Sequence, residues 1–115
     1  MGEAKEHLQR GIEFKIAGQY DEAIIELQEA IKLDGMNCEA YRQLGLVYGF
    51  TGMFDESLEM LRKAKEIEPS NLDARNDLAL TYAMLGMIEE AKQEFMSVLE
   101  EDPSNEVARK NIVYF

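Results

Sequence analysis

Apolar side chains recur along the chain at steps of three and four residues, which is the spacing of one face of an α-helix. Residues 38–51 show it with Tyr41, Leu44, Tyr48 and Thr51, and polar side chains lie between them. Residues 55–67 repeat it with Leu58, Leu61, Ala64 and Ile67. The pattern predicts two amphipathic helices, 38–51 and 55–67. No alternating run of apolar and polar residues indicates a strand.

Glycine and proline mark where these helices end. Gly52 separates the two predicted helices, and glycine can adopt the left-handed conformation that ends a helix. Gly18 and Gly86 stand at the corresponding places 34 residues away on either side. Elsewhere the sequences 69–71 and 103–105 both read Pro-Ser-Asn, which predicts the end of one helix and a Ser or Asn cap for the next.

The whole pattern of apolar, small and glycine positions occurs three times at intervals of 34 residues. The middle copy reads Tyr41, Leu44, Gly45, Tyr48, Gly52, Phe54, Ser57, Leu61, Ala64 and Pro69. The copy before it reads His7, Arg10, Gly11, Phe14, Gly18, Tyr20, Ala23, Leu27, Ala30 and Gly35. The copy after it reads Arg75, Leu78, Ala79, Tyr82, Gly86, Ile88, Ala91, Phe95, Val98 and Pro103. Such units bury their apolar faces by stacking on one another, so the sequence predicts a short solenoid.

This period and signature resemble the tetratricopeptide repeat (TPR). The resemblance implies an all-α fold, a right-handed α-solenoid of antiparallel helix pairs. It places repeats at 4–37, 38–71 and 72–105 in one domain covering 1–115, with 106–115 as a partial capping helix. The chain departs from the usual residues at Arg10, Gly35, Ser57, Ala79, Ile88 and Val98.

Small residues inside the predicted helices indicate close packing. Gly11, Gly45 and Ala79 occupy the same place in the three copies. A glycine inside a helix costs about 1 kcal/mol relative to alanine unless something offsets that cost. We therefore expect a neighbouring helix to approach closely at these positions.

Composition excludes several classes of protein. The 115 residues are 46% hydrophobic and 30% charged, which fits one globular domain, and no apolar run has the roughly 18 residues of a membrane span. Residues 1–10 are polar and mixed in charge, unlike a secretory signal, so we expect a cytoplasmic protein. The lone Cys38 fits a reducing compartment.

The chain is strongly acidic, with 12 Lys and Arg against 23 Asp and Glu and a net charge of −11. We therefore expect neither nucleic acid nor an anionic membrane as a partner, because both require clustered cations. Much of the acid is expected on the outer side of the second helices, at Glu26, Glu29, Glu59, Glu94 and 100–102. A solvated face explains these residues most simply, and recognition of a basic partner is the alternative.

The residues for catalysis or metal binding are missing. His7 is the only histidine, and it holds the bulky first position of its repeat, where a packing role is expected. One His and one Cys cannot build a zinc site of the usual ligands, and Cys38 lacks the basic surroundings of a reactive thiolate. We expect no enzyme, no metal and no cofactor.

A second apolar stripe runs along the first helix of each predicted pair. It contains Leu8, Ile12, Ile16, Leu46, Phe50, Leu80 and Met84. In the TPR family the first helices line a concave face. The resemblance therefore implies ligand contacts at Leu8, Gln9, Ile12, Ile16, Arg42, Gln43, Leu46, Phe50, Asn76, Asp77, Leu80 and Met84. Such a face suits a peptide or an amphipathic helix of an unidentified protein partner, in an adaptor, scaffold or chaperone-like module. Alternatively, the stripe packs against the second helices or against a further repeat.

Some family members bind the carboxylate ends of heat-shock chaperones through a clamp of Lys and Asn. The matching places here hold Leu8, Ile12, Gln43, Asp73 and Asp77, so the resemblance implies that this clamp is absent. We expect instead a partner with apolar side chains and a positive charge near Asp77.

The C-terminal segment 107–115 suggests a second function. It carries the apolar residues Val107, Ile112, Val113, Tyr114 and Phe115. The last repeat of a solenoid exposes an apolar flank unless something covers it. The segment therefore folds back, joins copies of the chain into a homo-oligomer, or continues into a longer array.

Overall fold

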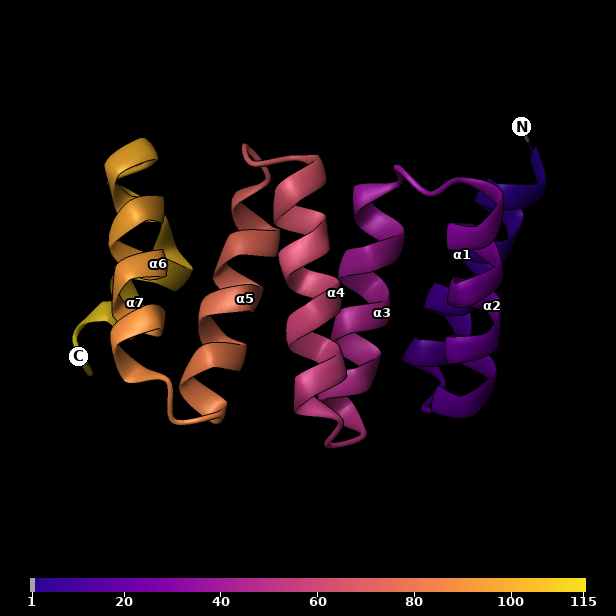
Figure 1. Cartoon of the computed structure of the whole chain (residues 1–115), viewed down its shortest axis with the longest axis horizontal. Helices are drawn as coiled ribbons and strands as arrows, with labels where there is room; N and C mark the ends of the chain where they lie inside the picture. The colour runs from indigo at the N-terminus through magenta and orange to yellow at the C-terminus, as the bar shows by residue number, and fades with distance from the viewer. Residues whose placement is uncertain (1) are drawn as a thin grey trace.

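The computed structural model describes residues 2–115, and within this range it contains seven helices and no strand. The helices are α1 (Gly2–Ile16), α2 (Tyr20–Leu33), α3 (Cys38–Phe50), α4 (Phe54–Ile67), α5 (Leu72–Met84), α6 (Ile88–Glu101) and α7 (Glu106–Ile112) (Figure 1). The predicted all-α solenoid is confirmed. The helix expected over 38–51 ends one residue earlier, and the one expected over 55–67 begins one residue earlier.

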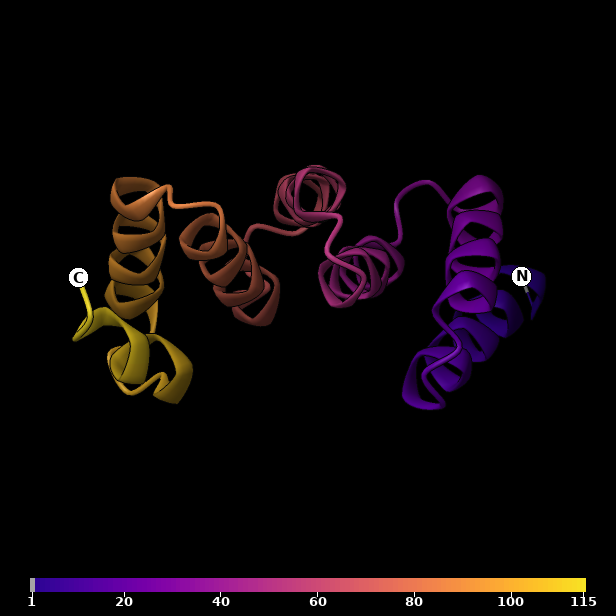
Figure 2. The ribbon, with the colours of Figure 1, turned by 90° about the horizontal axis from the view of Figure 1, so that it is seen from below.

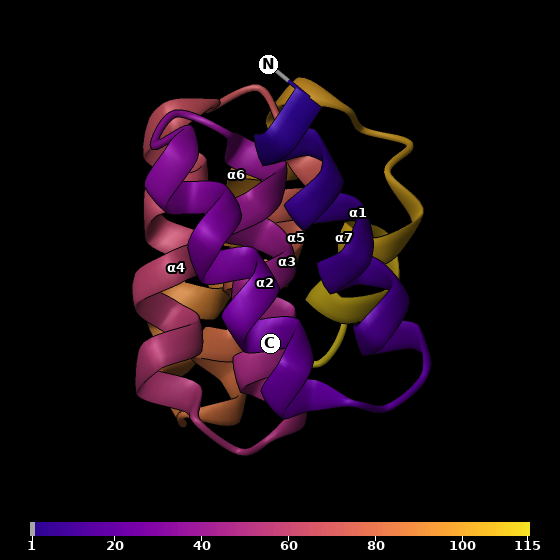
Figure 3. The ribbon, with the colours of Figure 1, turned by 90° about the vertical axis from the view of Figure 1, so that its right-hand side faces the viewer.

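The helices form three pairs, α1–α2, α3–α4 and α5–α6, which we call the first, second and third pairs. Each pair packs on the next through contacts of α2 with α3 and of α4 with α5, and α7 packs on α6. Figure 2 shows the row as an arch, with α1, α3, α5 and α7 on its inner side and α2, α4 and α6 on its outer side. The end-on view of Figure 3 likewise places α1 and α7 on the same side, away from α4. The row measures 40 × 27 × 20 Å.

The three turns inside the pairs share one backbone conformation. Gly18, Gly52 and Gly86 have φ angles of +77°, +79° and +77°, as predicted for residues that end helices. After the second of these, the N–H of Met53 donates to the carbonyl oxygen of Tyr48 at 2.8 Å and closes the turn. Because the three turns are alike, the pairs repeat with the same internal geometry.

Asparagine caps the helix that follows each turn between pairs. The side-chain oxygens of Asn37, Asn71 and Asn105 accept hydrogen bonds from backbone N–H groups three residues later, at 3.1, 3.0 and 3.1 Å. Each bond satisfies one of the N–H groups that a helix start leaves free. The predicted caps at 71 and 105 are confirmed, and the cap at 37 works without a preceding proline.

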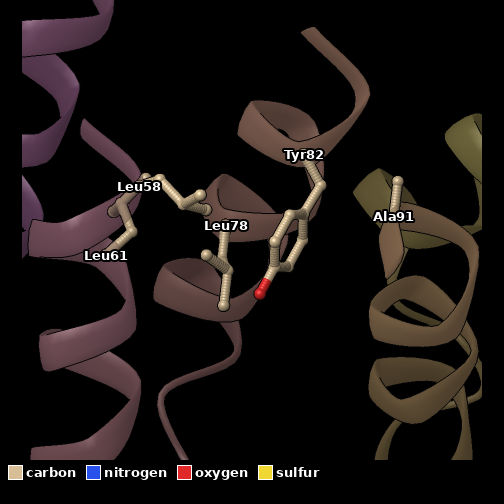
Figure 4. Packing of buried hydrophobic residues seen from close by; sticks show 5 residues of the cluster. All are labelled: Leu58, Leu61, Leu78, Tyr82 and Ala91. Atoms are coloured by element: carbon tan, nitrogen blue, oxygen red, sulfur yellow. The ribbon is translucent and has the colours of Figure 1, made fainter. Parts of the chain in front are cut away.

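The core lies between the inner and outer helices, where buried side chains form four clusters along the row. Leu27, Leu61 and Phe95 hold the same place in the three pairs and are almost fully buried. Figure 4 shows how the second and third pairs join: Leu58 and Leu61 of α4 approach α5, and α6 lies beyond it. Burial of these side chains supplies the main stabilisation of a stacked repeat.

Glycine permits close packing in the first two pairs, as expected. A Cβ atom on Gly11 would lie 2.6 Å from Cγ of Leu27, and one on Gly45 would lie 2.8 Å from Cγ of Leu61. Both distances are too short for real carbon contacts. Ala79, the third member of the set, is fully buried beside Phe95.

The C-terminal segment folds back on the third pair, which was one of the three alternatives considered. The ring of Phe115 lies 5.9 Å from that of Phe95, and Ile112 packs on the same cluster. Val113 and Tyr114 stay exposed at 74% and 81%.

The expectation that Glu94 belongs to a solvated outer face is wrong. Glu94 is buried, and its carboxylate accepts from Lys65 Nζ at 2.9 Å and from Arg75 Nε at 3.3 Å. Arg75 also donates to the carbonyl oxygen of Pro69 at 3.0 Å and to the Ser97 hydroxyl. A buried carboxylate needs such partners, because its desolvation is otherwise very costly.

The residue that faces Glu94 explains why Glu94 is buried. Arg75 holds the bulky first position of its repeat and points at α6. In the first pair the matching residue, His7, is half-buried, and its Nδ1 lies 2.6 Å from a carboxylate oxygen of Glu26. His7 thus lies between helices as expected, with a polar partner that the sequence analysis did not foresee.

Candidate functional site

A hollow of about 180 Å³ opens on the inner side of the row, between α3 and α5. Its lining consists of Gly45, Leu46, Gly49, Phe50, Ser57, Asp77, Leu80, Thr81 and Met84. Four of these are apolar residues of the predicted stripe, and Asp77 is one of its polar residues. The structure therefore brings together the parts of the stripe that come from the second and third pairs.

The apolar side chains of the hollow are largely uncovered. Phe50 is 59% exposed, Met84 is 66% exposed and Leu80 is 36% exposed, whereas Leu46 is half-buried. The polar floor is satisfied, because the Ser57 hydroxyl donates to the carbonyl oxygen of Gly45 at 2.7 Å. The hollow therefore offers apolar surface with its floor already hydrogen-bonded, which suits an apolar side chain of a ligand.

The stripe residues of α1 lie on the same inner side but outside the hollow. Ile16 is 77% exposed, and Ile12 is half-buried. Leu8 is half-buried and packs on the core between the first and second pairs. Gln9 is exposed and donates to Glu13 at 3.3 Å. Only part of the α1 stripe is thus free surface.

An ion pair between α3 and α5 borders the hollow. Arg42 Nε donates to Asp77 Oδ2 at 2.6 Å, and another nitrogen of Arg42 lies 3.4 Å from a carboxylate oxygen of Glu39. Burial raises the pKa of the Asp77 carboxyl, and the hydrogen bond from Arg42 opposes that rise. Burial works to lower the pKa of Arg42, but the carboxylates of Asp77, Glu39 and Asp73 outweigh it and the pKa is raised. The pair is therefore already matched within the chain.

A second polar contact joins α1 to α3. Lys15 Nζ donates to Gln43 Oε1 at 2.5 Å, and Gln43 Nε2 donates to Glu39 at 2.6 Å. Burial lowers the pKa of Lys15, and the positive charge of Arg42 lowers it further. Lys15 and Arg42 thus lie among the carboxylates of Glu39, Asp73 and Asp77 on the inner face.

Two of the polar residues that were predicted to contact a ligand are buried. Gln43 is 7% exposed and Asn76 is 2% exposed. Asn76 Nδ2 donates to the side-chain oxygen of Asn105 at 3.0 Å, while its own Oδ1 is buried without a partner. The start of α7 covers Asn76, and the contact with Lys15 covers Gln43.

Sequence reasoning missed Gly45, Gly49, Ser57 and Thr81 as lining residues. Gly49 carries the one usable signal, because a glycine next to the exposed Phe50 leaves the helix surface open. Ser57 comes from the outer helix α4, and its position in the hollow depends on how closely α3 and α4 approach.

Cys38 is buried and donates to the carbonyl oxygen of Ala64 at 3.4 Å, and burial raises the pKa of its thiol. No group of three His, Cys, Asp or Glu residues within 2–115 converges as metal ligands would. Over the same residues, no helix combines the length and apolar character needed to cross a bilayer.

Several solved structures share this architecture. The first TPR of Spaghetti (RPAP3), bound to the HSP90 peptide SRMEEVD, is 23% identical with a TM-score of 0.94, over 98% of this chain and 90% of that one. The second TPR domain of human RPAP3, in complex with the HSP70 peptide SGPTIEEVD, is 26% identical with a TM-score of 0.91, over 97% and 93%. YrrB, described as a TPR protein with an unusual peptide-binding site, is 25% identical with a TM-score of 0.87. That match covers 96% of this chain and 57% of YrrB.

The family models give the assignment. The model of the TPR repeat matches residues 11–52, and the model of the tetratricopeptide repeat matches residues 51–110, which is more than half of the chain. No curated protein sequence matches significantly. Together with the seven-helix solenoid, these matches show that the chain belongs to the tetratricopeptide repeat family.

Proposed function

We propose that the inner face binds a peptide or an amphipathic helix of a partner protein, with the hollow between α3 and α5 as its centre. The TPR family is a protein-interaction fold and is generally non-enzymatic, and the chain has its architecture. We further propose which residues of this face contact the ligand.

The exposure of Phe50, Leu80 and Met84 is the observation that carries the proposal. These side chains come from two helices and border one hollow. Covering apolar surface is favourable by about 25 cal/mol per Å² removed from water. A ligand side chain that fills the hollow would gain this energy without displacing any hydrogen bond of the floor.

The proposed roles differ along the inner face. Leu46, Phe50, Leu80 and Met84 contact apolar groups of the ligand, and Ile16 extends that surface toward α1. Arg42 and Asp77 orient the ligand backbone from the border of the hollow, while the buried Gln43 and Asn76 hold α3 and α5 in place. Leu8 and Ile12 contribute where they reach the surface.

The peptide complexes among the similar structures support peptide binding in general. The peptides named there carry two adjacent glutamates and a final aspartate. In this chain Asp77 at the hollow is paired with Arg42, but the exposed Asp73 lies close enough to act on the same pair and would repel an acidic peptide. We therefore propose a ligand of different sequence from those two peptides.

Selection from a random peptide display library tests the proposal. Peptides enriched on the unaltered protein should lose at least about tenfold in affinity for a Phe50→Glu variant, because the new charge would be desolvated in the hollow. Ile25→Glu is the matched control, since Ile25 is 65% exposed on the outer helix α2. Peptides that bind Phe50→Glu and the unaltered protein equally would show that the hollow is not the site.

Self-assembly through 107–115 is a second candidate function. The exposed Val113 and Tyr114 at the end of the row favour it. If it holds, sedimentation velocity should show an oligomer that a Val113→Ser, Tyr114→Ser variant converts to monomer. A monomer at all concentrations of the unaltered protein would exclude it. Phe115 is left unchanged, because it packs on Phe95.

A further inference from the structure

An exposed apolar strip continues the hollow to one edge of the molecule. Ile16, Phe50 and Met84 are the last residues of α1, α3 and α5, with exposures of 77%, 59% and 66%. Met53, which precedes α4, and Ile88, the first residue of α6, add exposures of 40% and 48%. We call these five residues the turn-edge strip.

The regular turns explain why these residues form a row. In each pair a glycine of positive φ follows the last residue of the first helix by two positions. The same turn therefore places Ile16, Phe50 and Met84 alike, and the turns that follow α1, α3 and α5 lie along the lower edge of the row in Figure 1. The rings of Phe50 and Tyr20 lie 5.8 Å apart and connect the first two pairs at this edge.

Carboxylates accompany the turn-edge strip in every pair. The first turns of α2, α4 and α6 carry Asp21, Glu22, Asp55, Glu56, Glu89 and Glu90. All six are exposed, and none forms an ion pair with another residue of 2–115. Acidic residues stabilise the start of a helix, which accounts for their presence there. Their charges nevertheless remain without an ion-pair partner at the edge of the row where the turn-edge strip lies.

The centre of the inner face is different in this respect. There Arg42 is already paired with Asp77, and Lys15 contacts Gln43. The carboxylate of Asp77, expected from the sequence to attract a cation, is therefore occupied within the chain. Six exposed carboxylates without an ion-pair partner in 2–115 lie instead along the turn edge.

We infer that the ligand of this face is a basic amphipathic segment. Its apolar residues cover the turn-edge strip and the hollow, and its Lys or Arg residues lie against the carboxylates at the starts of α2, α4 and α6. This inference rests on the proposed function, because Phe50 and Met84 belong to both surfaces. Complementary charge speeds association and rejects acidic segments, and its effect weakens as salt is added.

Two designed peptides serve as probes. One is a helix of about 14 residues, four turns, with Leu at steps of three and four residues so that Leu forms one face and Lys the other, and the second peptide carries Glu in place of every Lys. Fluorescence anisotropy of labelled peptides should show at least about tenfold tighter binding of the Leu–Lys peptide, with a preference that falls as salt rises. Equal binding of the two peptides would overturn the inference.

Charge variants separate the turn edge from the acidity of the whole chain. Asp55→Asn with Glu56→Gln removes two carboxylates of the turn edge. Glu68→Gln with Glu100→Gln removes two exposed carboxylates elsewhere that also lack ion pairs, so the net charge changes equally. The first variant should weaken binding of the Leu–Lys peptide about tenfold, and the second less than about twofold. Equal weakening by both would show general attraction and overturn the inference.

A Phe50→Ser variant distinguishes this inference from the proposed function. If Phe50→Ser weakens binding while Asp55→Asn with Glu56→Gln has no effect, the hollow remains the site and the basic ligand is wrong. If only the carboxylate variant weakens binding, the apolar hollow is not the site. Circular dichroism should show unchanged helix content for all these surface variants.

Discussion

The second and third helix pairs are the same hairpin built with different chemistry. In the second pair the bulky first position is Tyr41, and Met60 holds the place opposite it on α4. In the third pair the same two places hold Arg75 and Glu94, a buried ion pair. The backbone therefore accepts either an apolar or an ionic contact here, provided that both partners change together.

A second difference concerns volume. In the second pair Gly45 leaves room for Leu61, whose Cγ would lie 2.8 Å from an added Cβ. In the third pair Ala79 is accommodated beside the larger Phe95, whose ring packs on Phe115 at the end of the row. Neighbouring pairs confine the second pair on both sides, whereas the third pair is bounded by the short α7.

Breaking the ionic contact should have the largest effect. Arg75→Met leaves the buried Glu94 with Lys65 alone and should lower the free energy of unfolding by about 3 kcal/mol. Urea unfolding followed by circular dichroism measures it. The double variant Arg75→Tyr, Glu94→Met transfers the chemistry of the second pair and should lie within about 1 kcal/mol of the unaltered protein. A double variant as unstable as the single one would refute the equivalence of the two pairs.

Filling the glycine positions should have the next largest effect. Gly45→Ala places a Cβ against the buried Leu61, and overpacking of about 1–3 kcal/mol should exceed the gain in helix propensity of about 1 kcal/mol. Gly49→Ala is the control, since its Cβ would lie 3.6 Å from Ser57 Oγ, an ordinary contact, so this variant should be more stable. Thermal unfolding of both variants decides the matter. Equal stabilisation by both would show that α3 and α4 do not approach as closely as described.

Removing a helix cap should cost more stability at the end of the row, at Asn105, than at Asn37. Asn105→Ala removes the cap of α7 and the partner of the buried Asn76 amide, so we expect a loss of about 2 kcal/mol. Hydrogen exchange should rise most in α7. Asn37→Ala removes a cap alone, and its loss should be about 1 kcal/mol. An identical cost for both variants would mean that the contact between Asn76 and Asn105 contributes nothing.

The smallest expected effect concerns reactivity rather than stability. Cys38 belongs to the second pair, and Leu72 holds its place in the third. Burial raises the pKa of the Cys38 thiol, and the reactive thiolate is therefore scarce at neutral pH. Modification by a disulfide reagent should be at least about tenfold slower in the folded protein than in urea. Comparable rates in the two conditions would mean that the start of α3 is open.

The sequence alone was sufficient for the fold, and physical reasons explain why. A repeated spacing of apolar residues, three glycines at equivalent turns and asparagine caps each specify local structure, and all of them agreed with one architecture. The predicted end of α3 and the predicted start of α4 each differed from the structure by one residue, because helix ends fray and their exact position depends on the cap.

The candidate site was less accessible to such reasoning. Phe50, Leu80 and Met84 were placed on an exposed stripe, and the structure has them exposed. Gln43 and Asn76 were expected beside them but are covered by Lys15 and by α7, and Glu94 was expected outside but is buried. These contacts join segments roughly 20 to 30 residues apart, and helical periodicity does not report which long side chain bends toward which neighbour.

The contact between Tyr20 and Phe50 gives the protein a built-in optical reporter. The chain has five tyrosines and no tryptophan, so its near-ultraviolet absorption and emission come mainly from tyrosine. The ring of Tyr20 lies 5.8 Å from Phe50, at the edge where a bound segment would exclude water. Occupancy of that edge would alter the environment of this phenol, so binding can be followed by the light it emits, without attaching a dye to the protein.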